Sequence, residues 1–124
     1  MPIRGIRGAT TAAENTRAAI LAATRELLQA LIAANDLREP DIASAYFTVT
    51  PDLDAAFPAR AARDLGWTST ALLDAQAPHV AGDLPCCIRV LVHWNTDHTQ
   101  SEIQNIYLRE ARTLRPDRVK EKSE

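Results

Sequence analysis

Apolar residues recur along residues 16–34 at the three-, four- and seven-residue spacings of a helix that buries one face. Thr16 suits the N-cap of this helix, and Asn35 is a residue type at which helices commonly end. The pattern therefore predicts a long helix over residues 16–34 that covers a sheet on one side only. Its apolar positions are Ile20, Leu21, Leu27, Leu28, Leu31 and Ile32, and its polar face carries Arg17, Arg25, Glu26 and Gln29.

Shorter segments have the composition of strands, with further helices between them. Pro58 suits the first position of a helix that ends at Gly66, and Thr99 with Glu102 matches a capping box that starts a helix through Leu108. Residues 74–85 contain two prolines and a glycine and are expected to form a loop. The predicted strands are residues 2–9, 44–50, 67–73 and 87–95, the last of which is expected to be central, and a short strand near residues 112–114.

Strands and helices mix without a strict alternation, which indicates an α+β or irregular α/β domain of about five strands and two or three helices. At 124 residues the chain fits one domain. We expect this domain to cover residues 1–117 and to be followed by a flexible, charged tail at residues 118–124. Exposed sheet edges in so short a chain make self-association an expectation.

Composition excludes several classes of partner. The net charge of −2 gives no attraction to nucleic acid or to an anionic membrane surface. No apolar run approaches the ~20 residues of a membrane span, and the first residues lack the apolar core of a signal peptide. The two cysteines, Cys86 and Cys87, are neighbours, and on a strand their side chains would point to opposite faces. We therefore expect reduced thiols, one of them buried, and a cytoplasmic protein.

The sequence also lacks the motifs of most cofactor-dependent and covalent chemistry. His79, His93 and His98 do not have the spacing of metal ligands. There is no glycine-rich phosphate loop and no nucleophile-elbow motif. We therefore expect a site with no metal and no cofactor.

Several arginines lie among apolar or small neighbours. Arg7 and Arg89 fall inside predicted strands, where a guanidinium needs an anion or several oxygens as partners. That partner is either a structural carboxylate or an anionic ligand, and spacing alone leaves both open. Arg60 and Arg63 lie three residues apart on one helix face, which is more often solvated than a binding site. Tyr107 is either a core residue or a hydroxyl donor. The arginines point to a small ligand with two carboxylates.

The opening run Ile3-Arg4-Gly5-Ile6-Arg7-Gly8-Ala9-Thr10-Thr11 resembles the start of the small trimeric chorismate mutases of the α/β-barrel class. No single motif would suffice, but an ordered set of matches from residue 2 to about residue 117 is highly specific. The further matches are Thr50-Pro51-Asp52-Leu53, Ala56-Phe57-Pro58-Ala59, Ala62-Arg63, Cys87-Ile88-Arg89-Val90, Ile106-Tyr107-Leu108 and Leu114-Arg115-Pro116-Asp117.

This resemblance implies an α/β pseudo-barrel, a homotrimer with a barrel-like core, and active sites at the subunit interfaces. It implies the cofactor-independent Claisen rearrangement of chorismate to prephenate, a step towards phenylalanine and tyrosine. Arg89 would be the catalytic cation at the breaking ether bond, and Arg7 and Tyr107 would hold a substrate carboxylate. The other residues that match substrate-binding positions are Phe57, Ala59, Arg60, Arg63, Leu73, Leu114 and Arg115.

The chain departs from the family pattern at one position. Family members carry there a Glu that hydrogen-bonds the ring hydroxyl of chorismate and supports the key arginine, and this chain has Ala77. Asp74, three residues upstream, would then supply the catalytic carboxylate, unless it is a turn or cap residue. The predicted function is a chorismate mutase with Asp74 in place of the Glu. The alternative is a low-activity or non-catalytic trimeric binder of chorismate-like di-acids.

Overall fold

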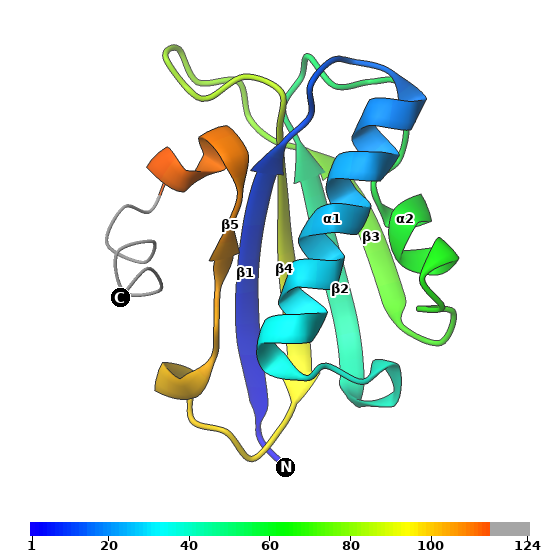
Figure 1. The fold of residues 1–124 in the computed structure, drawn as a ribbon, viewed down its shortest axis with the longest axis vertical. Helices are drawn as coiled ribbons and strands as arrows, with labels where there is room; N and C mark the ends of the chain where they lie inside the picture. The colour runs from blue at the N-terminus through cyan, green and yellow to red at the C-terminus, as the bar shows by residue number, and fades with distance from the viewer. Residues whose placement is uncertain (115–124) are drawn as a thin grey trace.

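The computed structural model describes residues 1–114, which form a mixed five-stranded sheet with two α-helices (Figure 1). The strand order is β3-β2-β4-β1-β5, and β4 is antiparallel to both of its neighbours, whereas β3 is parallel to β2 and β5 is parallel to β1. This arrangement confirms the predicted fold class and the central place of β4. The strands are β1 (Ile3–Thr11), β2 (Ile42–Val49), β3 (Ala71–Gln76), β4 (Cys87–Asn95) and β5 (Ile106–Tyr107).

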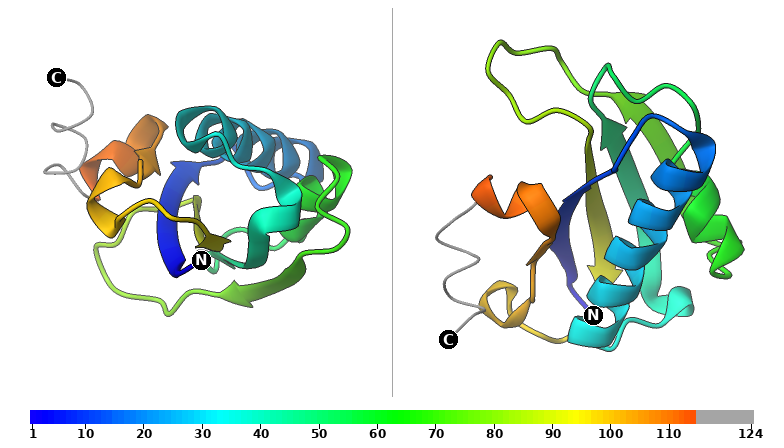
Figure 2. Two further views of the ribbon diagram at one scale, coloured as in Figure 1. Left: turned by 90° about the horizontal axis from the view of Figure 1, so that it is seen from below. Right: turned by 45° about the horizontal axis from the view of Figure 1, so that its top comes forward.

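Both helices, α1 (Arg17–Asn35) and α2 (Ala59–Asp64), lie on the same face of the sheet (Figure 2). The Thr16 hydroxyl accepts a hydrogen bond from the Ala19 N–H at 3.1 Å and caps α1 as the sequence predicted. None of the described helices is long and apolar enough to cross a bilayer. The described residues also contain three short 3₁₀ helices: η1 (Glu39–Asp41), η2 (Gln100–Glu102) and η3 (Arg109–Thr113).

The hydrophobic core lies between α1, α2 and the covered face of the sheet. Alternate strand residues point to this face, and their side chains interdigitate with the apolar face of α1. Gly8 permits the close approach of α1 to β1, because a Cβ at this position would lie 3.0 Å from Leu31 Cδ1. The fully buried members of the core include Ile6, Leu27, Leu28, Leu31, Phe47 and Val92.

Neither α-helix lies over the opposite face of the sheet, where among the described residues η3 packs against the sheet, through Ala111 and Ala9. Register places Arg7, Leu91, Tyr46 and Leu73 in one row across β1, β4, β2 and β3. The three apolar or aromatic members of this row are 38–57% exposed. Residues that pair across strands share a face, so the row presents an apolar surface beside the Arg7 side chain. This surface is called the uncovered face below.

The structure corrects the predicted boundaries of the third strand. Trp67 is a buried core residue in the turn after α2, where its N–H donates to the Ala62 carbonyl at 3.0 Å. Gly66 has a φ of 99°, which ends the helix and redirects the chain. The strand therefore begins at Ala71, not at residue 67, and extends to Gln76, so Asp74 belongs to a strand and not to a loop.

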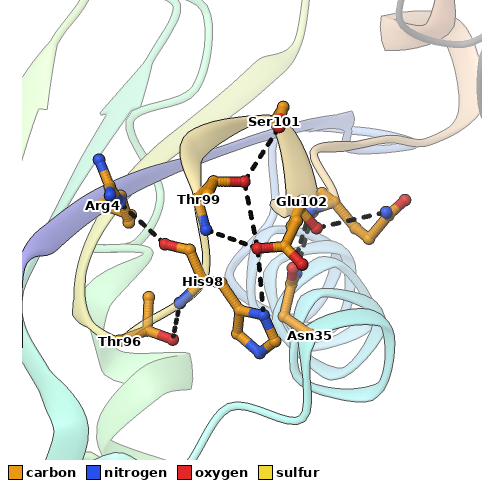
Figure 3. Close-up of polar contacts among 8 residues, drawn as sticks. Arg4, Asn35, Thr96, His98, Thr99, Ser101 and Glu102 are labelled. Carbon is orange, nitrogen blue, oxygen red and sulfur yellow. Dashed lines mark hydrogen bonds and ion pairs between the residues drawn. The ribbon is translucent and has the colours of Figure 1, made fainter.

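The C-terminal helix and the final short strand were also predicted wrongly. The capping box of Thr99 and Glu102 forms, with the Thr99 N–H donating to the Glu102 carboxylate at 2.7 Å, but it starts only the single turn η2 (Figure 3). The Asn105 side-chain carbonyl accepts a hydrogen bond from the Arg7 N–H at 2.8 Å, and the chain then pairs with β1 as β5. Residues 106 and 107 thus pair with the open edge of β1, although the local sequence favours a helix. Residues 109–113 form η3 instead of a strand.

We predict that Leu31→Ala lowers the free energy of unfolding by about 2–5 kcal/mol, because it opens a cavity between α1 and the sheet at a fully buried position. Urea denaturation measures the effect. Val80→Ala, at a side chain that is 60% exposed in the loop before β4, is the control and should change stability by less than about 0.5 kcal/mol. Equal effects of the two substitutions would contradict this description of the core.

Candidate active site

A pocket of about 370 Å³ lies against the uncovered face of β1, β4 and β2. Its size is in the range of small-ligand sites. The pocket brings together three of the residues predicted to bind a di-acid: Arg7 from β1, Arg89 from β4 and Tyr107 from β5. Its other lining residues are Gly8, Ala9, Tyr46, Thr48, Val90, Leu91 and Leu114.

Arg89 lies in the row that joins Ala9, Arg89 and Thr48 across β1, β4 and β2. Its side chain is 44% exposed, and its Nη2 lies 3.5 Å from Asp83 Oδ1. Sequence reasoning left open whether a structural carboxylate or a ligand would pair with this arginine. In the structure Arg89 pairs with the carboxylate of Asp83, and its guanidinium still remains accessible from the pocket.

Arg7 and Tyr107 add a second cation and a hydroxyl to the same pocket. The Arg7 side chain has no ion pair with any residue among 1–114, although its N–H is bonded to Asn105. The Tyr107 hydroxyl is buried and has no hydrogen-bond partner among these residues. A buried hydroxyl without a partner is costly, which makes this oxygen a candidate for a hydrogen bond to a ligand.

The remaining predicted site residues lie elsewhere in the chain, around the start of α2 and the edge strand β3. Phe57 is 70% exposed, whereas Ala59 is buried at the first turn of α2. Arg60 pairs with Asp64 at 3.1 Å on the exposed side of the helix, and Arg63 is also exposed. Phe57 and Asp74 border a second groove, separate from the pocket of Arg89.

Asp74 does not reach Arg89 within one chain. It is in register with Phe47, which faces the helices, whereas Arg89 is in register with Thr48 on the uncovered face. One Asp74 oxygen accepts a hydrogen bond from the Ala59 N–H at 2.9 Å, a favourable place for a carboxylate at the start of a helix. Burial raises the pKa of the Asp74 carboxyl, and the Ala59 hydrogen bond and the Arg63 charge partly offset this.

Ala77 follows directly on β3, and its N–H donates to the Val49 carbonyl at 2.8 Å. Strand alternation places it on the same side as Ala75, which is in register with Thr48 on the uncovered face. An acidic side chain at position 77 would thus point to the side of Arg89. Alanine leaves that place without a carboxylate.

The structure adds residues that sequence reasoning missed. Tyr46 and Thr48 line the pocket, and strand alternation within β2 could have placed them there. Asp83 lies in the loop before β4, and no periodic pattern signals its contact with Arg89. Leu114 lines the pocket as expected, whereas Arg115 lies outside the described residues, as does the end of the predicted domain.

The two cysteines are free thiols. Cys87 is buried and Cys86 is half-buried. Burial raises the pKa of each thiol, so both remain protonated at neutral pH. Neither is suited to act as a nucleophile.

Comparison with known proteins defines the class to which this fold and pocket belong. The family described as chorismate mutase type I matches residues 3–118, and the chain belongs to this family. A chorismate mutase from Thermus thermophilus is 51% identical over 116 residues, which cover 93% of this chain and 95% of the relative. A chorismate mutase from Bacillus subtilis is 42% identical over 118 residues, covering 94% and 93%.

A solved structure agrees with the sequence comparisons. The chorismate mutase from Clostridium thermocellum superposes with a TM-score of 0.86 at 51% identity and covers 88% of this chain and 97% of its own. The family resemblance inferred from the ordered motifs is thereby confirmed, as is the fold class.

We predict that Tyr107→Phe leaves the free energy of unfolding unchanged or raises it by up to about 1 kcal/mol, because it removes a buried hydroxyl that has no partner. Urea denaturation of both proteins without ligand measures the difference. A loss of about 2 kcal/mol or more would mean that the hydroxyl is bonded in the folded protein.

Proposed function

We propose that this protein is a chorismate mutase that converts chorismate to prephenate in the biosynthesis of phenylalanine and tyrosine. The observation that supports this most is the convergence of Arg7, Arg89 and the unpartnered Tyr107 hydroxyl on one pocket, in a chain of the chorismate mutase type I family. These groups suit a small di-acid. The reaction breaks one C–O bond and forms one C–C bond within the substrate, and it needs neither a cofactor nor a covalent intermediate.

The first task of the site is to hold chorismate in a compact conformer, with the enolpyruvyl group over the ring. Fixing this conformer removes rotational freedom before the barrier is reached. In our proposal Arg7 and Tyr107 bind a substrate carboxylate, Arg7 by its charge and Tyr107 by its hydroxyl, which has no partner among the described residues. Leu114 closes part of the pocket wall.

The second task is to stabilise the charge that develops as the ether bond breaks. Negative charge builds on the ether oxygen in the transition state, and a fixed guanidinium beside it binds the transition state more tightly than the substrate. Arg89 has this role in our proposal, because it is the arginine of the pocket that a carboxylate holds at one side while its other donors remain accessible.

We also propose that the protein is a homotrimer with interfacial sites. The uncovered face presents Tyr46, Leu73 and Leu91 to solvent in a single chain, which is unfavourable for a monomer. A second copy placed against this face would bury them and bring its α2 region to the pocket of Arg89. The residues that this copy would contribute are Phe57, Ala59, Arg60, Arg63, Leu73 and Asp74, and Arg115 would belong to the same site.

A cytoplasmic location is part of the proposal. The two free, protonated thiols agree with a reducing compartment.

Ala77 favours a second candidate function, a trimer that binds chorismate-like di-acids without rearranging them. Incubation of the purified protein with chorismate, followed by measurement of prephenate, distinguishes the two functions. Prephenate formation well above the uncatalysed rate supports the mutase. Protection of the fold by chorismate without product formation supports the binder.

We predict that Arg89→Lys lowers kcat by roughly 100-fold or more, because lysine keeps the charge but loses the planar donor fork. The free energy of unfolding should change by less than about 1 kcal/mol, since the side chain is partly exposed. Arg25→Lys on the exposed side of α1 is the matched control and should keep parental turnover. Near-parental kcat in Arg89→Lys would contradict the role of this arginine.

For Asp74→Asn we predict that the protein still folds and that its stability depends less on pH than that of the parent. In Asp74→Asn the amide oxygen still accepts from the Ala59 N–H, so the protein should remain folded. Because burial raises the pKa of Asp74 above 3.8, the parent loses stability as pH rises from about 3.8 through the raised value, and the asparagine variant should not. Urea denaturation at several pH values tests this.

If ionised Asp74 completes the site of a neighbouring subunit, kcat/KM falls as pH drops through its raised pKa, and Asp74→Asn has low activity at every pH. Asp74→Ala should be equally poor, and adding Ala77→Glu to it should recover part of the activity. Full activity of Asp74→Asn would show that no carboxylate is needed at this position.

A further inference from the structure

We propose that Asp83 is a positioning residue that holds the guanidinium of Arg89 in the orientation the reaction needs. This inference rests on the proposed function. It assigns to a carboxylate of the loop before β4 one of the two tasks that an acidic residue at position 77 would have, the support of the arginine. Contact with the ring hydroxyl of the substrate is left to another group, for which Asp74 of a neighbouring copy is our candidate.

The first observation is the ion pair itself. Asp83 Oδ1 lies 3.5 Å from Arg89 Nη2, and the Asp83 side chain is only 29% exposed. Among residues 1–114 it is the one carboxylate that pairs with an arginine of the pocket. Neither position 77 nor position 74 can supply this carboxylate within a single chain, because residue 77 is alanine and Asp74 faces the helices.

The second observation is that hydrogen bonds within the loop hold both the backbone and the carboxylate of Asp83. The Asp83 N–H donates to the Val80 carbonyl at 3.0 Å, and Gly82 supplies the positive φ of 82° that this turn requires. The Leu84 N–H donates to Asp83 Oδ1 at 2.8 Å. The backbone of the loop therefore holds the same carboxylate oxygen that pairs with the arginine.

The third observation anchors this loop to the pocket. Leu84 packs against the cluster of Ala9, Tyr107 and Ala111, and Ala9 and Tyr107 both line the site. The loop between β3 and β4 runs on the side of the sheet away from α1, towards η3 (Figure 2). Asp83 is thus tied through Leu84 to the same wall that carries Arg89.

The energetics favour a role in orientation over a role in stability. A partly exposed ion pair contributes little to folding, about 0–1 kcal/mol. A guanidinium is a rigid fork, however, so fixing one Nη limits the directions of its other donors. A small misplacement of such a group has a large cost in rate. Asp83 also lowers the net positive charge of the pocket, which weakens its attraction for a di-anionic substrate.

Removing the Asp83 charge should therefore harm the orientation of Arg89 and at the same time strengthen the attraction for the substrate, so kcat and KM report the two effects separately. We expect Asp83→Asn to lower kcat by about 10-fold while KM for chorismate stays the same or falls. The amide oxygen can still accept from the Leu84 N–H, so the loop should keep its turn. Asp83→Glu, which restores the charge on a longer side chain, should recover part of the lost kcat.

Asp97→Asn is the matched control, because it removes one negative charge from an exposed loop at the far end of β4. It should leave kcat and KM at the parental values. A kcat of Asp83→Asn within about twofold of the parent, or above it, would overturn the inference, because the reaction would then not need the carboxylate. An equal loss of kcat in Asp97→Asn would also overturn it.

A second readout does not depend on turnover. The Nε–Hε NMR signal of Arg89, assigned by its loss in Arg89→Lys, should shift in Asp83→Asn and stay in place in Asp97→Asn. An unchanged Arg89 signal in Asp83→Asn would mean that the ion pair does not form. If the parent protein makes no prephenate, the proposed function fails, whereas the NMR result still decides whether Asp83 pairs with Arg89.

Discussion

Both α-helices pack on one face of the sheet, and this packing decides which strand residues can enter the core. It divides each strand into residues that face the core and residues that do not. In β1 and β4 the core side carries Ile6, Val90 and Val92, and the other side carries Arg7 and Arg89. The same alternation that builds the core therefore places two cations on the face that neither α-helix covers. The alternation of strand residues thus determines both the core and the candidate site.

This division also separates the predicted site residues into two groups within one chain. The pocket has cations and a free hydroxyl, but the second set of predicted residues lies around α2 and β3, away from it. An apolar row that is open to solvent is unfavourable, and in the proposed trimer a second copy would cover it and contribute the residues around α2 and β3. In the proposed trimer, a single contact would bury the exposed apolar row and also complete the pocket. Asp83 is different, because it serves Arg89 from within the same chain.

Sequence reasoning was reliable where a feature repeats along the chain. The helical period of α1 and the apolar run of β4 predicted both elements to within two residues of their observed ends. It failed where a contact distant in sequence decides, as for β5, which the open edge of β1 recruits through Asn105. The face of Asp74 could not be predicted, because the start of β3 was placed four residues too early and Asp74 was assigned to the loop. The contact of Asp83 is set by loop geometry, which no sequence period encodes.

In the proposed trimer two different chains build each active site, and mixing two kinds of inactive subunit tests this arrangement. One set of chains carries Arg89→Ala, and the other carries Arg63→Ala with Asp74→Ala. Each set alone should be inactive. Trimers refolded from an equal mixture should recover about a quarter of the parental turnover, because that share of interfaces would join an intact Arg89 to an intact α2 region. A mixture as inactive as its components would mean that each site lies within a single chain.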